Sequence, residues 1–600
     1  MVAGDSGSIL VSASSVKILG VLCGGIGPSP YATATFQIVP EISDEVLDSI
    51  NPFYTVAPTA LSLPVVNQTS ERSILDHFIT PSSSAVYLGT LPNYVHNRPH
   101  TNIRKSAVFE LVKPLMESVP MIPILHPRVI ETDEGHVYVD PYNVSCAILN
   151  THEGIEPPVG LVLKAFEDFV SVLDDIPVDV AKKGGPLTTQ QAINGAHPFD
   201  RMPVNTAAGI PLGGKKKDYL FQNTDGSYSF REGVEEAYLA YRKEYLRGRG
   251  RPIMSAHLKD EVKSVKKILA GLERMFNGSP FFFTTLSREF LMPIIVFIMD
   301  HNREFEHCVG INCMDPKQWG QLYEDLKTHG FIFDGDFAKF DLRHLRTVLL
   351  CFINFCVMIA KKYLDYSDFD IRMVVQLLTD MIYYIVCVKG DLVEFVQGFC
   401  SGAIITVIIN SFVVCIYVRL AWFMKGFTAK FRSRNVLRVY GDDNVVNTKE
   451  VSFTFLVIRD TLKEFGLVYT PSDKSDSPAP FSSIENIAFL KRKFVEAEVK
   501  GQKVVLCPLE EQSILKSLLY VKCPKSEEKI QIAKNIVDAQ KQYWYHGPEK
   551  FHSWKETFRS WTIACDISLA EEGSNSALRW MSDDELADQY LAQKMTIAFT

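Results

Sequence analysis

The sequence has few of the features that mark secreted, zinc-binding or disulfide-bonded proteins. Its 12 cysteines form no Cys-x-x-Cys pair and show no regular spacing. This argues against a zinc site or a disulfide framework and indicates reduced thiols in an intracellular protein. Residues 1–30 lack a charged start followed by an apolar run, so no secretory signal is predicted. The sequence also shows no internal repeat and no low-complexity tract. Together these absences favour a globular protein without a disulfide-linked partner.

A strong excess of one charge is missing as well. Charged residues make up 22% of the chain and the net charge is −8, which excludes wholesale disorder and a uniformly basic coat for nucleic acid. A local basic zone remains, because residues 215–274 hold 14 Lys or Arg against 9 Asp or Glu. With 600 residues and 46% apolar content, the chain has enough material for a large core and several subdomains.

Long apolar runs are few. The run at 403–418 is too short for a comfortable membrane span and contains Thr406, Asn410 and Ser411. We therefore expect a buried helix there, and another at 346–360. No intrinsic transmembrane segment is predicted, and a membrane-embedded protein is the alternative.

From residue 331 onward, strand-like and helical patterns alternate. Residues 331–336 predict a buried strand, and a helical stretch follows at 345–364. Residues 381–398 predict a hairpin, and 436–448 predict a second hairpin after an apolar helix at 403–424. The last hundred residues mainly show helical spacing. This order predicts an α+β fold in which an antiparallel sheet is flanked by helices.

Two adjacent carboxylates, Asp442 and Asp443, stand at the turn of the second hairpin, between apolar runs. Asp336 ends the strand at 331–336. If the hairpin pairs beside that strand, Asp336 and Asp442 meet at one edge of the sheet. Such a cluster of hard oxygens suits Mg²⁺, and two such ions support an in-line phosphoryl displacement. For the adjacent pair alone, a surface turn with solvated acids is the alternative.

Four segments in a fixed order carry a family resemblance. They are DFAKFD (336–341), SGAIITVIIN (401–410), YGDD (440–443) and FLKR (489–492). They resemble the viral RNA-dependent RNA polymerases of the picornavirus-like supergroup, and the resemblance runs from about residue 100 to the end. It implies a closed right hand, with fingers at 46–330, a palm with an inserted fingers segment at 331–495, and a thumb at 496–600.

The resemblance implies the catalytic residues. Asp336 and Asp442 match the two metal-binding aspartates, and Asp443 matches the acid beside them in the metal set. The implied cofactor is Mg²⁺, for which Mn²⁺ can substitute. FGLVYTPSDKS (465–475) resembles the segment whose lysine acts as general acid, so Lys474 would protonate the leaving pyrophosphate. A surface lysine in a turn is the alternative for Lys474.

Further matched residues concern the ribose of the incoming nucleotide. Asp341, Ser401 and Asn410 match the group that senses the 2′-hydroxyl, which both donates and accepts hydrogen bonds. Thr406 matches the threonine of the same helix. Hydrogen bonding between core helices is the alternative for Thr406 and Asn410.

The segment HLKDEVKSVKKILAGLERMF (257–276) resembles the fingers motif that lines the nucleotide entry channel. The residues on its basic positions are Lys259, Lys263, Lys267 and Arg274. Arg274 is the expected triphosphate contact, because a guanidinium offers a planar fork of donors. Val265 and Leu272 stand where the family often has basic residues, so the channel is expected to be less positive. A solvated amphipathic helix is the alternative.

Two segments resemble RNA contacts. RMPVNTAAGIPLGGKKK (201–217) resembles the template-entry motif, in which Thr206 and Gly209 match while the usual serine and tyrosine are missing. FLKR matches the primer-grip hairpin, with Lys491 and Arg492 placed for backbone phosphates.

Residues 1–45 predict a short β-rich segment with a Gly-Asp-Ser-Gly context. They resemble the C-terminal barrel of the chymotrypsin-like protease that precedes the polymerase in picornavirus-like polyproteins, with Ser6 at the nucleophile position. The His and the acid of a triad would come from earlier chain, so we expect an inactive remnant that starts at a processing boundary. A β-rich extension packed on the fingers is the alternative.

The expected function is template-directed RNA synthesis that replicates a positive-strand RNA virus genome. The implied partners are an RNA template and primer, ribonucleoside triphosphates, a small genome-linked protein as primer, and other viral proteins of a membrane-associated replication complex in the host cytoplasm. The alternatives are a protease–polymerase precursor with serine protease activity, a reverse transcriptase and a membrane-embedded scaffold. The group Asp341, Ser401 and Asn410 favours ribonucleotides over the substrates of a reverse transcriptase.

Overall fold

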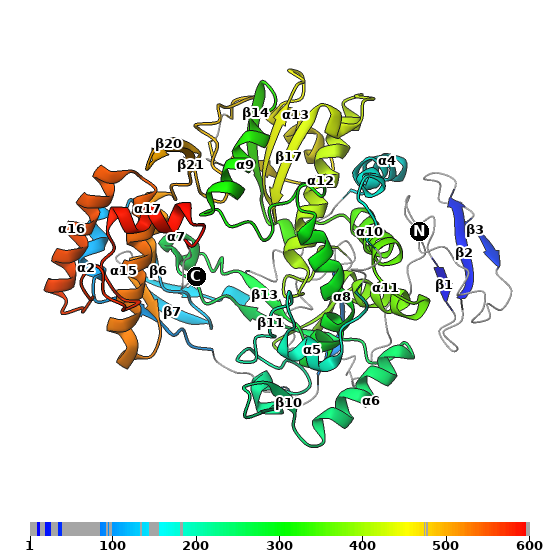
Figure 1. Ribbon diagram of the computed structural model, residues 1–600. Coiled ribbons are helices and arrows are strands. Elements are labelled where there is room, and N and C mark those ends of the chain that lie inside the picture. The colour runs from blue at the N-terminus through cyan, green and yellow to red at the C-terminus, as the bar shows by residue number, and fades with distance from the viewer. Residues whose placement is uncertain are drawn as a thin grey trace.

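The structure is a computed structural model (Figure 1). It describes residues 85–595 apart from gaps at 92–93, 95–98, 133–134, 143, 145–154, 180–183, 396, 473 and 476–477. Ahead of them it describes the backbone of three strands, β1 (Ile9–Val11), β2 (Ile18–Gly25) and β3 (Ala34–Ile38), which pair in that order as an antiparallel sheet. Short strands were predicted in this part of the chain. Ser6 lies outside the described residues.

A four-stranded antiparallel sheet lies in the segment predicted as the palm, in the order β17-β18-β14-β19 (Figure 1), and is called the palm sheet below. The strands are β14 (Phe331–Phe337), β17 (Asn435–Tyr440), β18 (Asp443–Thr448) and β19 (Tyr469–Thr470). The predicted hairpin of β17 and β18 pairs beside β14 through β18, with Gly335 opposite Asn444. The register therefore brings the hairpin turn level with the end of β14.

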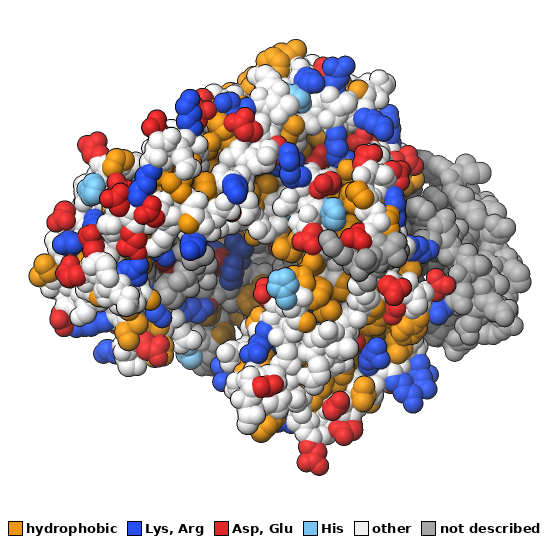
Figure 2. Space-filling model, in the orientation of Figure 1, with side chains coloured by type: hydrophobic (Ala, Val, Ile, Leu, Met, Phe, Trp, Pro, Cys, Tyr) orange, Lys and Arg blue, Asp and Glu red, His pale blue; other side chains and the backbone are white. Residues whose placement is uncertain are grey.

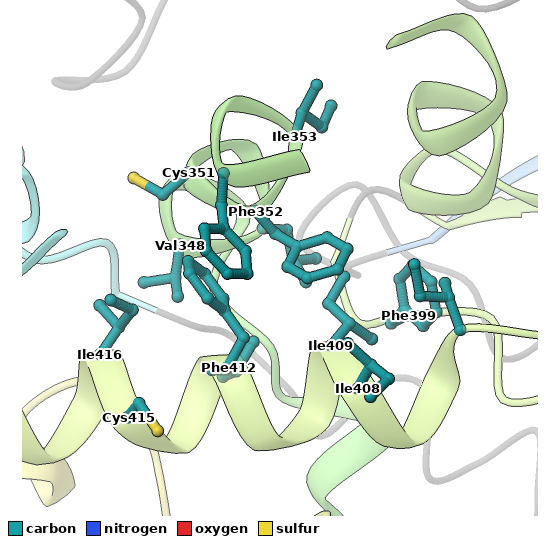
Figure 3. Close-up of a cluster of buried hydrophobic side chains, with 14 of the residues drawn as sticks. Val348, Cys351, Phe352, Ile353, Phe399, Ile408, Ile409, Phe412, Cys415 and Ile416 are labelled. Carbon is teal, nitrogen blue, oxygen red and sulfur yellow. The ribbon is translucent and has the colours of Figure 1, made fainter. Parts of the chain in front are cut away.

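Helices pack on this sheet and on one another, and they contribute to the main hydrophobic core. They are α10 (Arg346–Tyr363), α12 (Thr406–Met424) and α13 (Phe455–Lys463). Figure 3 shows Phe412 of α12 pointing toward Val348 and Phe352 of α10, and the rings of Phe352 and Phe412 lie 5.2 Å apart. Dense aromatic packing of this kind fixes α12 against α10.

Among the described residues, two helices are long and apolar enough to cross a membrane, namely α12 and α8 (Phe281–Asp300). The apolar windows of α8 and α12 are 78% and 83% buried inside the protein. Both are therefore core helices of the folded chain, as predicted for the run at 403–418. The cysteines in the described part of the chain are free thiols.

A buried ion-pair network joins α12 to the edge of the palm sheet. Arg419 is fully buried and donates hydrogen bonds to Asp168 (2.8 Å) and to both oxygens of Glu306 (2.7 and 3.0 Å). The backbone amide of Val439 in β17 donates to the Glu306 carbonyl at 3.0 Å. Removing one partner would leave a buried charge uncompensated, so the network fixes β17 against the helix.

A second, five-stranded sheet lies next to the palm, in the order β13-β11-β15-β16-β4. It contains β4 (Ala85–Thr90), β11 (Ile253–Leu258), β13 (Met275–Gly278), β15 (Ile385–Val388) and β16 (Asp391–Phe395). The hairpin of β15 and β16 was predicted at 381–398. The parallel pairing of β11 with β15 was not predicted, because it joins segments more than a hundred residues apart.

The basic segment 257–276 consists of loops and short strands with one short helix, which excludes the alternative of a single amphipathic helix. It runs from the end of β11 through β12 (Lys263–Ser264) and a five-residue helix, α7 (Val265–Leu269), into β13. The backbone amide of Lys259 donates to the carbonyl of Arg274 at 2.8 Å. The two ends of the segment therefore lie side by side, and their cations reach the same region.

The C-terminal part is mainly helical, as expected, with α14 (Glu511–Leu519), α15 (Glu528–Trp544), α16 (Pro548–Ala564) and α17 (Asp583–Leu591). A hairpin of β20 (Val495–Val499) and β21 (Gln502–Leu506) precedes them and was not predicted. β22 (Tyr520–Lys522) pairs with β5 (Ile103–Lys105), so the early chain closes onto the C-terminal helices. Figure 2 shows a hollow beside these helices with Lys and Arg side chains inside it.

Candidate active site

Asp336 and Asp442 meet at the edge of the palm sheet, as the sequence predicted. Asp336 lies near the end of β14, and Asp442 lies in the two-residue turn between β17 and β18, where Gly441 has φ +64. A glycine suits this turn because left-handed backbone is costly for other residues. Burial, and next the charge of Asp336, raise the pKa of Asp442 to about 6. The two carboxyl groups therefore repel one another in a partly desolvated place.

Asp443 points away from this pair toward a neighbouring loop. Its Oδ2 accepts a hydrogen bond from the backbone amide of Leu490 at 2.7 Å. Burial raises the pKa of Asp443 to about 7, and the charges of Asp336 and Asp442 add to this shift. Asp443 thus belongs to the same electrostatic cluster, but one of its oxygens is already used in holding the loop at 489–492.

Lys474 reaches the carboxylate pair from the loop after β19. Its ammonium forms an ion pair with Asp336 and donates to the Thr470 hydroxyl at 3.2 Å. Thr470 in turn lies opposite Asp336 in the β14–β19 register. The lysine side chain is 57% exposed, so the ammonium sits at an open edge of the acidic cluster where a phosphate group has access.

The carboxylate oxygens of Asp336 and Asp442 are suitable ligands for a divalent cation that prefers oxygen, such as Mg²⁺. One carboxylate comes from the end of β14 and the other from the turn between β17 and β18, and their mutual repulsion is the kind that a cation relieves. Among the described residues, no group of three or more His, Cys, Asp or Glu could hold a metal ion by itself. Mg²⁺ typically binds through one or two carboxylates together with water and substrate phosphates, and the pair matches that requirement.

The predicted ribose-sensing residues come together in part. The Asn410 amide donates to Asp341 Oδ1 at 3.0 Å. Burial raises the pKa of Asp341, while the Asn410 hydrogen bond and the charges of Arg274 and Lys259 act against this rise. Asp341 therefore faces both the helix α12 and the cations of the basic segment.

Ser401 and Thr406 flank that pair and bond to the backbone. The Ser401 hydroxyl accepts from the amide of Asn277 in β13 at 3.3 Å. The Thr406 hydroxyl donates to the carbonyls of Ala403 (2.8 Å) and Cys400 (3.1 Å) at the start of α12. Thr406 thus stabilises the local turn, and Ser401 ties the turn to the second sheet.

The basic segment is organised around an acid that the sequence reasoning missed. The carboxylate of Glu261 lies 3.2 Å from the ammonium of Lys259 and 3.6 Å from the guanidinium of Arg274. Both cations stay partly exposed, at 45% and 67%. Lys267 is exposed on α7. The sequence does show Glu261 among the basic residues predicted to bind phosphate, and an acid at that place could have indicated an internal ion-pair partner.

Lys263 is placed differently from the prediction. Its side chain is only 12% exposed, and its ammonium donates to the carbonyl of Leu272 at 2.9 Å. Glu261 and the buried Glu273 lie 3.7 and 3.9 Å away. Burial lowers the pKa of Lys263. This side chain is therefore bound to partners inside the segment, on β12, which pairs with β6 (Pro120–Met121).

The predicted template-entry segment is a compact loop. The Thr206 hydroxyl accepts a hydrogen bond from the buried ammonium of Lys216 at 2.7 Å. Gly209 has φ +75, and an added Cβ there would lie 3.0 Å from the backbone of Pro280. Gly209 thus serves a close approach to α8, and Lys216 is a buried cation that sequence reasoning did not single out.

The two basic residues of FLKR lie in different surroundings, because Lys491 is exposed and Arg492 is buried. Lys491 is 71% exposed, with its ammonium 3.5 Å from Glu510 and 3.3 Å from the Ser513 hydroxyl. Arg492 is 9% exposed, and its guanidinium donates to the carbonyl of Cys507 at 2.7 Å. The tight turn of this segment sends successive side chains to opposite sides, so the predicted phosphate contact of Arg492 is replaced by a contact inside the fold.

The sheet, its helices and the carboxylate pair with its adjacent lysine form a palm-type fold with an acidic site at the ends of its strands. Comparisons with known proteins agree. Residues 110–561 match the family described as viral RNA-dependent RNA polymerase. Because that match covers most of the chain, the chain belongs to the viral RNA-dependent RNA polymerase family.

Individual relatives point the same way. The RNA1 polyprotein of Cherry rasp leaf virus is 28% identical over 467 residues, which are 71% of this chain and 20% of that polyprotein. The replicase polyprotein of Drosophila C virus (strain EB) is 27% identical over 311 residues, 49% of this chain and 18% of that polyprotein. The chain thus spans about a fifth of the length of these curated relatives. The solved structure of a Sicinivirus RNA-dependent RNA polymerase has the same fold, with a TM-score of 0.68, 18% identity, and coverage of 84% of this chain and 98% of that one.

Proposed function

We propose that this chain synthesises RNA on an RNA template from ribonucleoside triphosphates, and that it replicates the genome of a positive-strand RNA virus. The observation that carries the proposal is the meeting of Asp336 and Asp442 at one sheet edge, with the ammonium of Lys474 beside them. Two acids and one cation at an open edge are the groups that nucleotidyl transfer needs.

In the reaction, the 3′-hydroxyl of the primer loses its proton to solvent, its oxygen forms a bond to the α-phosphorus of the nucleotide, and the bond from that phosphorus to pyrophosphate breaks. Asp336, Asp442 and the assisting Asp443 would hold Mg²⁺, or Mn²⁺ in its place. The bound ions would activate the attacking oxygen and stabilise the leaving one. Lys474 would give its proton to the departing pyrophosphate, since an ammonium can donate to a developing anion.

The basic segment and α12 would position the nucleotide. Arg274 and Lys259 are partly exposed and would bind the triphosphate in exchange for Glu261. Lys267 would add positive charge at the entrance. Asp341 and Asn410 would bind the 2′-hydroxyl, because together they offer an acceptor and a donor.

The remaining residues would hold the ribose-binding turn or contact RNA. Ser401 and Thr406 would keep the ribose-binding turn in place, Thr206 and Gly209 would border the template path, and Lys491 would contact a backbone phosphate. We propose the domain boundaries given above for fingers, palm and thumb. We also propose that residues 1–45 are an inactive remnant of a chymotrypsin-like protease.

The wider setting is proposed from the family and its polyprotein relatives. A small genome-linked protein would prime synthesis, and other viral proteins would bring the enzyme to membrane-associated replication sites in the host cytoplasm. The curated relatives are polyproteins several times longer than this chain, and such neighbours would supply these partners.

The test is primer extension by the purified 600-residue chain. An RNA primer on an RNA template, with Mg²⁺ and ribonucleotides, should be extended to the template end. Chelation of the metal should stop extension. Extension that prefers deoxynucleotides would instead indicate a reverse transcriptase, and loss of a peptide-cleaving activity in Ser6→Ala would indicate a protease. A chain that incorporates nothing across several templates and metals would overturn the proposal.

A further inference from the structure

One side chain next to the carboxylate pair bonds to three separate segments of the palm. Asn444 is fully buried. Its amide nitrogen donates to the carbonyls of Gly335 (3.1 Å) and Asp442 (3.0 Å). Its Oδ1 accepts from the Tyr469 hydroxyl at 2.7 Å. The carboxamide thus uses both of its donors and one acceptor on β14, on the hairpin turn and on β19.

The contact between Tyr469 and Gly335 closes this arrangement. A Cβ added at Gly335 would lie 2.0 Å from the hydroxyl of Tyr469. The phenol ring therefore occupies the space in which any side chain at residue 335 would stand, and Tyr469 is itself buried. Gly335, Asn444 and Tyr469 form one interlocked group, which we call the Asn444 lock.

Each segment held by the lock carries one of the reacting side chains, within five residues of the bonded residue. Asp336 follows Gly335, and Asp442 supplies one of the bonded carbonyls. Lys474 lies five residues after Tyr469, and its partner Thr470 lies opposite Asp336. The lock is therefore the place where the positions of two acids and one cation are set relative to one another.

We propose that Asn444 and Tyr469 are positioning residues that set the spacing of the two metal-binding carboxylates. They touch neither substrate nor metal in this role. The inference rests on the proposed function, because it assigns the carboxylate pair to a divalent cation. Removal of a group that orients metal ligands through hydrogen bonds, without binding the metal itself, typically lowers metal affinity by about 10- to 100-fold.

The same strand offers a matched control. Asn447 is 1% exposed, and its amide nitrogen donates to the carbonyls of His329 and Phe331 at 3.0 Å each. Its Oδ1 accepts from the His329 amide at 2.7 Å. Asn447 thus makes the same number of hydrogen bonds at the far end of β14. Its loss should cost comparable stability and leave the carboxylate spacing unchanged.

The experiment is a titration of the full chain, without RNA, with MnCl₂, followed by the electron paramagnetic resonance signal of free Mn²⁺. Asn444→Leu keeps the branched shape and removes the polar atoms, so its affinity for Mn²⁺ should fall about 10- to 100-fold. Tyr469→Phe removes one hydrogen bond, so its affinity should fall about two- to tenfold. Asn447→Leu should bind Mn²⁺ like the wild type. Thermal denaturation of all three variants shows whether their stabilities are comparable.

The outcomes separate this inference from the proposed function. Wild-type chain that neither binds Mn²⁺ nor extends a primer would overturn the proposed function. If the wild type does both, equal affinities in Asn444→Leu and wild type would overturn the lock, and so would equal losses in Asn444→Leu and Asn447→Leu. If Asn444→Leu does not fold, Tyr469→Phe decides, because wild-type affinity in that variant contradicts the inference.

Discussion

The acids and the cations of this site are held in opposite ways. Asp336 and Asp442 stand at the ends of paired strands, and the register of the sheet brings them together. The cations stand on loops and on short elements between β11 and β13, where Glu261 and neighbouring carbonyls bind them. The acidic half is therefore preorganised by backbone hydrogen bonds. The basic half is organised by side-chain ion pairs that a phosphate group can replace.

This difference has a physical reason. Carboxylates that repel one another need a rigid frame, and a buried sheet supplies it. Cations that must release one anion and take up another need weak partners, and partly exposed ion pairs are weak. The frame sets where the metal would bind, whereas the loops would adapt to the nucleotide.

The largest expected effect comes from a comparison within β14. Asp336 faces the site, whereas Asp334 accepts hydrogen bonds from the Ser472 hydroxyl (2.6 Å) and the Ala488 amide (3.1 Å). Asp336→Asn should slow primer extension about 10³-fold or more, because a metal-binding charge is lost. Asp334→Asn keeps an acceptor and should reduce the rate far less. Equal losses of rate in single-turnover extension would contradict the assignment of metal binding to Asp336 and of a structural role to Asp334.

The next comparison separates two cations of one segment. Arg274 is exposed near Asp341, whereas Lys263 is buried against Leu272. Arg274→Ala should raise the KM for ribonucleotides about 10- to 100-fold, the cost of one charged hydrogen bond. Lys263→Ala should mainly lower the melting temperature. A larger KM effect in Lys263→Ala would show that the loop rearranges when nucleotide binds.

The sequence predicted the positions of the acids at the strand ends better than the directions of the basic side chains on loops and short elements. The strand-like runs and the hairpin turn placed Asp336 and Asp442 at the ends of strands, and the family resemblance matched them as a pair. The register of β14 with β18 brings them together in the structure. The direction of Lys263 and Arg492 could not be read in this way, since it depends on turns and on distant partners such as Cys507. Asn444 was read as part of an apolar flank, and its role became visible only when β14 and β19 were in place.

A smaller effect is expected in RNA binding. Lys491 is exposed beside the 489–492 turn, whereas Arg492 is buried on Cys507. Lys491→Ala should weaken binding of primed RNA and reduce the slope of log affinity against log salt by about 1. Arg492→Ala should lower thermal stability instead. Fluorescence anisotropy across a salt series measures the slope, and an unchanged slope in Lys491→Ala would remove Lys491 from the phosphate contacts.

The smallest expected effect concerns pH and the acids themselves. The pKa of Asp443 is raised to about 7 by burial, so the folded chain keeps this proton longer than the unfolded chain does. Stability should therefore fall as pH rises through about 7 in the absence of metal. The buried His307, whose pKa is lowered to about 4, acts in the opposite sense only below its unfolded value of 6.5.

The measurement is the melting temperature in chelator between pH 6.5 and 8. The wild type should lose about 0.5 °C more than Asp443→Asn over that range, because linkage gives about 0.8 kcal/mol and a chain of this length has a large entropy of unfolding. Mg²⁺ should reduce the difference, because a cation offsets the repulsion. Identical slopes in the two proteins would contradict the raised pKa.

The most direct test of the central claim is primer extension by Asp442→Ala beside the wild type, with the same RNA template, ribonucleotides and Mg²⁺. If the carboxylate pair at the palm edge carries RNA synthesis, the wild type extends the primer, and the variant melts at the wild-type temperature or above but yields no extended product. Extension by a folded Asp442→Ala at a rate within about tenfold of the wild type would contradict the account.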